Sequence, residues 1–507
     1  MSQEKILSLD DLAQKSSLLR KEGKRIVLCH GTFDLMHIGH IRYLKSAREK
    51  GDVLFATVTA DDFVNKGPGR PIFPQDLRAE NLSALACVDY VAINNAPTAV
   101  NVISKLKPHA YAKGNDYKNL DDDVTGNIHL EKKAVEEGGG EIIFTDEIIF
   151  SSTKLLNDHF GVFPDETKKY LHKFSEKYSD VNIIEILNSL RRLKVLVVGD
   201  TIIDEYHFTT PLGQSAKGTH LAVQHDYCER FLGGGLAIAN HLAGFVESVT
   251  VVSGLGKEKE SEDFIRSNLA ENISAKLYYF DDAPTVVKQR FVDADLNKLF
   301  EVYLYKEDSK LENSGRELCS WLGKSLGDFD VVIVSDFGNG FITPEMIEPL
   351  CSRSRFLAVN TQMNSGNSGY HTITRYPRAD FVSLNEPEAR LATHNRYDPI
   401  EHVAQNLAVQ LKTRHFAVTR GTKGVMLFDV EESQANKVPA LSTKVLDRVG
   451  AGDAFLSFSA MCLGGGLSPD VAAFVGSAAA ALDVQIVCNK EPISPGNLFK
   501  YLGTLLK

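Results

Sequence analysis

Short apolar runs and amphipathic segments alternate along most of this sequence. Runs such as Ile26–Cys29, Asp52–Thr59 and Val331–Val334 have the length and composition of buried strands. The segment Ile41–Arg48, which follows the first run, has apolar residues at helical spacing. Strands that alternate with helices form parallel, doubly wound sheets. The pattern therefore predicts an α/β protein.

The pattern of strand, turn and helix restarts at Lys194–Asp200, so we expect two domains. A chain of 507 residues is also too long for one core. We predict a first domain over residues 1–157, a helical linker over 158–193 and a second domain over 194–507. Alternating segments near 205–230 and 284–304 predict a small extra sheet in the second domain. The linker has an apolar stripe that needs a partner in either domain or in a second subunit, formed by Leu171, Phe174, Ile183, Ile186, Leu187 and Leu190.

Composition narrows the class of protein. The chain is 43% hydrophobic and 24% charged, with a net charge of −10 and no dominant basic patch, which argues against nucleic acid and anionic membranes as partners. No apolar run reaches the ~18 residues of a membrane span, and the first residues lack the apolar core of a signal peptide. The seven cysteines are scattered and never in CxxC spacing. They predict reduced thiols in a cytoplasmic protein, neither a disulfide framework nor a zinc site.

The segment His30–His40, with the sequence HGTFDLMHIGH, lies between a predicted strand and a predicted helix. His37 and His40 are three residues apart, so they share one face of the helix start. Helix N-termini attract anions, and two imidazoles there would hydrogen-bond a phosphate whose charge grows in a transition state. This indicates attack by a phosphate on the α-phosphorus of a nucleoside triphosphate, with pyrophosphate leaving. The alternative is two polar residues that only cap the helix.

This segment resembles the HxGH signature of the cytidylyltransferase-like nucleotidyltransferases. Together with Lys66–Pro71, Arg78, Lys113–Tyr117 and Ser151–Thr153, it resembles the adenylyltransferase domain that activates heptose 1-phosphate. The resemblance implies a Rossmann-like fold, leaves ATP and CTP open, and places Asp116 with Lys113 near the sugar phosphate. Without it, Lys66–Pro71 is an ordinary solvated loop. The residues implied around the nucleotide are Thr32, Phe33, His37, His40, Lys45, Arg78, Lys113, Ser152 and Thr153.

A second phosphate motif lies at Asp447–Phe455, where Gly450, Ala451 and Gly452 form a turn at a predicted helix start and Asp453 follows. The N–H groups of small residues there would hold a γ-phosphate during transfer. Asp453 would take the proton from an attacking hydroxyl. The alternative is a carboxylate that only caps the helix.

This motif resembles the second signature of the PfkB, or ribokinase-like, sugar kinases, and the whole span 194–507 is similar to that family. The resemblance implies a ribokinase-like α/β domain whose small β lid forms a dimer interface in many members. It implies that Asp204 binds a sugar hydroxyl and that Gly234 belongs to the sugar-binding glycine motif. It also assigns Asn385 and Glu388 to Mg²⁺ and phosphate, and Thr419, Gly421 and Gly424 to the nucleotide.

Some positions depart from the nearest sugar kinases. Ala237 replaces the asparagine of the glycine motif, although Asn240 is retained as a substrate candidate. Asn360 and Gln362 lie in a segment where heptose kinases have Asp-Pro-Lys. The run after it, Met363–Arg378, is either a variable surface loop or a substrate loop adapted to another sugar. In the second case, phosphate on the substrate would pair with Arg290, Arg375 and Arg378.

The sequence therefore predicts a bifunctional enzyme of sugar-nucleotide synthesis. The second domain would phosphorylate a sugar or sugar phosphate with ATP, and the first would join a sugar 1-phosphate to a nucleotide from ATP or CTP. The two domains resemble the bifunctional heptose kinase/adenylyltransferase family in reversed order. Mg²⁺ would act through phosphates and water near Glu388 rather than through direct protein ligands, and the chain would form a homodimer or higher homo-oligomer. One rival is a kinase of nucleosides or other small alcohols, and another has one half as a non-catalytic binding or regulatory module.

Overall fold

The computed structural model describes residues 3–64, 70–114, 127–145, 163–307, 311–364, 366–367, 370–432 and 434–506. The chain forms two compact units, one of residues 1–164 with 499–507 and one of residues 165–498. Both units are built on mostly parallel sheets with helices between the strands, so the predicted α/β class is confirmed. None of the helices in the described ranges combines the length and the apolar composition needed to cross a bilayer.

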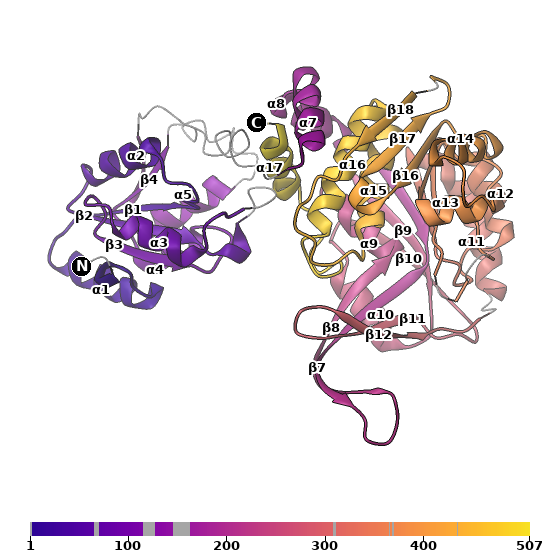
Figure 1. Cartoon of the computed structure of the whole chain (residues 1–507), viewed down its shortest axis with the longest axis horizontal. Coiled ribbons are helices and arrows are strands. Elements are labelled where there is room, and N and C mark those ends of the chain that lie inside the picture. The colour runs from indigo at the N-terminus through magenta and orange to yellow at the C-terminus, as the bar shows by residue number, and fades with distance from the viewer. Residues whose placement is uncertain are drawn as a thin grey trace. The chain divides into compact units, whose positions relative to one another are not determined.

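The first unit contains a five-stranded parallel sheet in the order β3-β2-β1-β4-β5 (Figure 1). Helices α2 and α3 cover one face of the sheet, and α1, α4 and α5 cover the other. The winding direction changes between β1 and β4, and ligands of doubly wound sheets bind at the carboxyl ends of such strands. The elements are α1 (Leu9–Lys21), β1 (Ile26–Gly31), α2 (Ile38–Arg48), β2 (Val53–Thr59), α3 (Gln75–Ser83), β3 (Tyr90–Asn94), α4 (Val100–Leu106), β4 (Ala110–Gly114), α5 (Asn127–Glu137) and β5 (Glu141–Thr145).

The second unit contains a nine-stranded sheet in the order β10-β9-β6-β13-β14-β15-β16-β17-β18, antiparallel only at β17 and β18. Its winding changes between β6 and β13. The strands are β6 (Lys194–Gly199), β9 (Ser248–Leu255), β10 (Ile273–Tyr279), β13 (Val331–Asp336), β14 (Leu357–Thr361), β15 (Phe381–Asn385), β16 (His415–Thr419), β17 (Val425–Asp429) and β18 (Gln434–Val438).

Helices cover both faces of this larger sheet (Figure 1). Helices α11 to α14 enclose the larger apolar core on one face, and α9, α15 and α16 pack on the other. The helices are α9 (Gly235–Ala243), α10 (Lys259–Asn268), α11 (Glu312–Ser325), α12 (Pro344–Arg353), α13 (Glu386–Ala392), α14 (Ile400–Gln410), α15 (Ala451–Gly464) and α16 (Pro469–Asp483). The last helix, α17 (Pro495–Leu506), begins in the second unit, and its residues from 499 onward belong to the first.

The small extra sheet has four strands in the order β12-β11-β7-β8, and we call it the lid. Its strands are β7 (Thr201–Gln214), β8 (Leu221–Gly234), β11 (Val286–Val292) and β12 (Lys298–Leu304). Successive side chains of a strand point to opposite faces. Asp204 and Tyr206 therefore lie on one lid face, where both are buried, and Glu205 and His207 lie on the other.

The segment before β6 forms α7 (Asp165–Lys177) and α8 (Asp180–Asn188), which belong to the second unit. The rings of Phe174 and Phe474 are 4.1 Å apart, and Lys177 Nζ lies 2.6 Å from Asp470. The apolar stripe of α7 therefore packs on α16. The linker boundaries at residues 158 and 193 stay predictions.

Candidate active sites

The N-terminus of α15 forms one wall of a cavity of about 580 Å³ in the second unit. Gly450 precedes the helix with a φ of +100°, a left-handed conformation that favours glycine. A Cβ at this position would also collide with Asn489 and Asp483. The first N–H groups of a helix lack partners within it, so this wall suits a phosphate.

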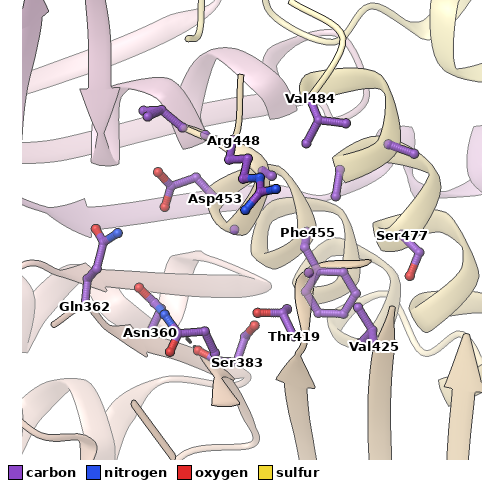
Figure 2. Close-up of a pocket in the computed structure, with 18 of the residues that line it drawn as sticks. Asn360, Gln362, Ser383, Thr419, Val425, Arg448, Asp453, Phe455, Ser477 and Val484 are labelled. Carbon is purple, nitrogen blue, oxygen red and sulfur yellow. Dashed lines mark hydrogen bonds between the residues drawn. The ribbon is translucent and has the colours of Figure 1, made fainter. Parts of the chain in front are cut away.

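Asp453 lies in the first turn of α15 and lines the same cavity. Figure 2 shows it beside Arg448, with Asn360 and Gln362 across the pocket. Burial raises the pKa of the Asp453 carboxyl to about 7, and the negative charge of Asp204 adds to the rise. A carboxylate with a pKa near 7 is well matched to accept a proton at neutral pH.

The lid supplies a second set of charges to the cavity. Asp204 on β7 forms a buried ion pair with Arg290 on β11. Lys288 lies beside Asp204 in the register of β11 and β7, and it is also buried. Burial lowers the pKa of Lys288, and the charge of Asp204 opposes this effect. Among the described residues its ammonium has no hydrogen-bond partner, and it lines the cavity.

Asn385 and Glu388 form a capping box at the start of α13. The Asn385 side chain accepts from the Glu388 N–H at 2.8 Å, and the Glu388 carboxylate accepts from the Asn385 N–H at 2.8 Å. Glu388 also accepts from Met363 N–H at 3.1 Å. Burial raises the pKa of Glu388 to about 7. Both residues line the cavity, so the cap of α13 also places the Glu388 carboxyl group on the cavity wall.

Most of the predicted residues of the second unit come together at this one cavity. Their nucleotide or substrate roles stay predictions. The predicted residues that line it are Asp204, Gly234, Arg290, Asn385, Glu388, Thr419, Gly421, Gly424, Gly450, Ala451, Gly452 and Asp453.

Three substrate candidates are not brought to the cavity. The Asn240 side chain donates to Asn268 O at 2.9 Å and accepts from Ala270 N–H at 3.0 Å, so it fixes the chain after α10. Arg375 Nη1 lies 3.0 Å from Asp336, and Arg378 binds the Asp380 carboxylate at 2.7 Å. The internal pairing of these side chains gives them structural roles here.

Lys288 is the residue that the sequence interpretation missed. The alternating run around it predicted a strand but gave no reason to choose this lysine. Its position opposite Asp204 depends on the parallel pairing of β11 with β7, which are separated by many residues. A cation next to the predicted Arg290 in the same alternating run was the one available signal.

The predicted phosphate turn of the first unit lies between β1 and α2, at the change of winding. His37 caps α2, and its Nδ1 accepts from Gly39 N–H at 3.1 Å. Burial lowers the pKa of His37, so its neutral form dominates near pH 7. In that form the proton is on Nε2, which makes this nitrogen a hydrogen-bond donor. The His40 ring stacks on His37 with centroids 4.0 Å apart.

Neighbouring side chains and backbone groups stabilise the turn that precedes α2. Phe33 has a φ of +48°, and its ring lies edge-on to His40 at 5.6 Å. Asp34 accepts N–H groups of Ile72 and Phe73 at 2.8 and 3.1 Å. His30, at the end of β1, contacts Thr57 Oγ1 at 2.9 Å, and burial lowers its pKa to about 3. This histidine is therefore a neutral structural group.

Arg78 lies on α3 with no exposed surface. Its guanidinium donates to the carbonyl groups of Phe73, Thr32 and Thr59 at 2.6–2.8 Å and pairs with Asp61. Here it braces the turn that carries Thr32, and its predicted contact with a nucleotide stays untested.

Replacing Arg78 by methionine is expected to lower the free energy of unfolding of the first unit by about 3 kcal/mol or more, because two buried carbonyl groups and one half-buried carbonyl group lose their donor. Calorimetry on the full chain measures this as a lower Tm for the unfolding transition of the first unit. Arg42→Met, on the exposed face of α2, is the matched control. Equal stability of the two variants would contradict the bracing role.

The remaining predicted residues of this site are spread more widely. Lys113, at the end of β4, pairs with Glu131 at 2.8 Å, and Lys45 is exposed along α2. The structure thus brings Thr32, Phe33, His37 and His40 together at one turn. The loop residues 65–69, Asp116, Ser152 and Thr153 lie outside the described residues.

Comparison with known proteins agrees with this division of the chain. Residues 28–157 match the family described as cytidylyltransferase-like. Two curated relatives, both named "Bifunctional protein HldE", come from Geobacter sulfurreducens and Pelobacter propionicus. They are 39% identical over 140 residues and 41% identical over 143 residues. These matches cover 27% and 28% of this chain and the same shares of the relatives, so little more than a quarter of their length is spanned.

The second unit has the more extensive match. A solved structure of the tetrameric inhibited form of phosphofructokinase-2 from Escherichia coli covers 62% of this chain and 100% of its own, with a TM-score of 0.50 and 17% identity. At this identity the likeness shows a shared fold. The model of the pfkB family carbohydrate kinases matches residues 192–488, which is more than half of the chain. With its glycine turn, aspartate and lid around one cavity, the chain belongs to the pfkB family of carbohydrate kinases.

Proposed function

We propose that the chain is a bifunctional enzyme of sugar-nucleotide synthesis. The second unit would phosphorylate a sugar or sugar phosphate similar to heptose 7-phosphate, with ATP as donor. The first would transfer a nucleotidyl group from ATP or CTP to a sugar 1-phosphate and release pyrophosphate. The observation that carries the proposal is the presence of functional groups at two helix N-termini, α2 with His37 and His40, and α15 with Asp453.

In the phosphoryl transfer, Asp453 takes the proton of the attacking hydroxyl while the turn at Gly450–Gly452 stabilises the phosphate charge. Asp204 accepts hydrogen bonds from the sugar. The Arg290 guanidinium already pairs with Asp204, which fixes the direction of this carboxylate before the sugar arrives.

The acceptor is proposed to carry a negative group of its own. Lys288 and Arg290 give the lid side of the cavity two buried cations, whereas Asp204 supplies one negative charge there. The Lys288 ammonium lies over the rings of Tyr303 and Phe337 but has no hydrogen-bond partner among the described residues, and a phosphate on the sugar would supply one. Asn360 and Gln362, also on the cavity wall, offer amides for sugar hydroxyls.

Mg²⁺ fits the chemistry of this cavity. Asp204, Glu388 and Asp453 give the cavity wall three carboxylates, and the charges of Asp204 and Glu388 help to raise the pKa of Asp453. Carboxylates are oxygen ligands of the kind that suits Mg²⁺ and its bound water. Mg²⁺ bound to the nucleotide supplies charge neutralisation of the phosphates. Glu388 would orient water in its shell.

In the nucleotidyl transfer, the His37 and His40 imidazoles stabilise the charge that develops on the α-phosphate and on departing pyrophosphate. The helix N-terminus adds a positive dipole at the same place. The name of these relatives, "Bifunctional protein HldE", supports two activities in one chain. The order proposed here places the transferase first.

The kinase reaction is expected to depend on pH through Asp453. A base with a pKa of about 7 is protonated at low pH, so kcat/KM of the free enzyme should rise about tenfold per pH unit below pH 7 and level off above it. Burial lowers the pKa of His37, so its imidazole is already neutral near pH 7, and nucleotidyl transfer in the same buffers should show no midpoint at pH 7. A kinase profile that levels off near pH 4 would contradict the raised pKa.

The experiment that tests the proposal is an assay of the full chain with ATP or CTP against sugars, sugar phosphates, sugar 1-phosphates and nucleosides. We expect phosphorylation to be fastest with a sugar phosphate, and pyrophosphate release only with a sugar 1-phosphate. Phosphorus NMR of the kinase product identifies the phosphorylated position. Preference for a nucleoside, or no pyrophosphate release with any acceptor, would favour the rival functions instead.

A further inference from the structure

The outer face of the lid carries a cluster of three metal-binding side chains. Glu205 and His207 lie two residues apart on β7, and Cys228 lies directly opposite His207 on the antiparallel β8. One ligand atom from each lies within 4.8 Å of the other two. This face is opposite to the one that carries Asp204 and Tyr206, so the cluster is separate from the cavity.

The spacing of the ligand atoms suits a tetrahedral ion. His207 Nε2 lies 3.4 Å from Glu205 Oε2 and 3.9 Å from Cys228 Sγ. Bonds of about 2.0–2.3 Å at tetrahedral angles place ligand atoms roughly 3.3–3.7 Å apart. Small side-chain rotations would therefore bring all three atoms onto one ion.

The surroundings hold two of the ligands in place. The His207 ring stacks on Phe291 with centroids 4.6 Å apart at 13°. Gln289 donates to Glu205 Oε2 at 2.9 Å, and Arg230 Nε lies 3.1 Å from Glu205 Oε1. Such outer contacts orient metal ligands in proteins. The Glu205 and His207 side chains are only 14% and 16% exposed, so little rotamer freedom is left to lose on binding.

We propose that Glu205, His207 and Cys228 bind a zinc-class divalent cation on the outer face of the lid. Thiolate, imidazole and carboxylate together select Zn²⁺ or Co²⁺ over Mg²⁺ or Ca²⁺. Binding releases the thiol proton to solvent, and the ion's two positive charges are balanced by the thiolate and the carboxylate. Water completes the shell. A further imidazole, that of His225, has its ring centroid 5.3 Å from that of His207.

The cysteine spacing in the sequence argued against a zinc site. That argument considered only closely spaced cysteines, whereas the ligands of this cluster come from two strands and include only one cysteine. A β-bulge at Phe208/Thr209 shifts the register of β7 and β8 directly beyond it. Bulges redirect side chains, and this one accompanies the ring contact of His225 with His207.

Cobalt substitution of the tag-free full chain tests the proposal. After chelation and dialysis, one equivalent of Co²⁺ should give a thiolate-to-cobalt charge-transfer band and the intense visible bands of a four-coordinate ion. Calorimetric titration with Zn²⁺ should give one tight site per chain, and Zn²⁺ should raise Tm.

The variants locate the ion. Cys228→Ser should abolish the charge-transfer band and weaken Zn²⁺ binding at least tenfold, and Glu205→Gln should weaken it while leaving the band. Cys319→Ser, a change of a half-buried cysteine on α11 in the same unit, should leave both unchanged. Circular dichroism verifies that each variant is folded. A missing band in the wild-type chain, or equal Zn²⁺ affinity in the wild type and Cys228→Ser, would overturn the proposal.

Discussion

Asparagine in place of Asp453 is expected to lower kcat for sugar phosphorylation by about 10²–10⁴-fold. The amide keeps the size of the side chain in the first turn of α15 but cannot take the proton of the attacking hydroxyl. Nucleotide binding should change little, because the turn at Gly450–Gly452 is untouched. Steady-state assays with the best acceptor measure kcat and KM separately.

The matched control is Glu345→Gln, which removes a carboxylate from the first turn of α12 at an exposed position. It should keep full kinase activity. Asp453→Asn should also keep pyrophosphate release by the first unit. If it removed both activities while the chain stayed folded, the proposal of two separate sites would be wrong.

Alanine in place of His37 is expected to slow nucleotidyl transfer by about 10²–10³-fold, the usual loss when one donor to a developing charge is removed. Phosphorylation by the second unit should not change. The rate of pyrophosphate release from ATP or CTP in the presence of a sugar 1-phosphate measures the effect.

His37 also caps α2 through its Nδ1, so alanine removes a cap worth about 1 kcal/mol. His37→Asn separates the two effects, because asparagine is a good cap but has no imidazole. Both variants should be equally inactive, while only alanine should lower stability. Activity in the asparagine variant would mean that the imidazole acts solely as a cap.

The sequence was most informative where a functional group and the turn that positions it are contiguous. His37 follows a short polar segment after a strand, and Asp453 follows a glycine turn, so local pattern alone predicted the place of each at a helix start. The order of strands and helices likewise predicted the α/β class and the alternating strands of the lid.

Prediction was weaker where pairing between distant segments decides the outcome. Asn240 follows the glycine turn at helical spacing, but its side chain points to the chain after α10. Arg78 was predicted to lie around the nucleotide, and its full burial depends on the carbonyl groups of three separate segments. Lys288 and Cys228 gain their neighbours only through the register of the lid strands.

The cavity of the second unit draws its two walls from different stretches of the chain. The lid and the end of β14 supply Asp204, Lys288, Arg290 and Asn360, all before residue 363, and the phosphate side is built from Asn385 onward. In the proposed function, the residues that recognise the acceptor and those that bind the donor phosphate are thus encoded in separate segments of the chain. A change of sugar specificity could then arise from substitutions before residue 363 alone, without any change in the residues proposed to bind ATP.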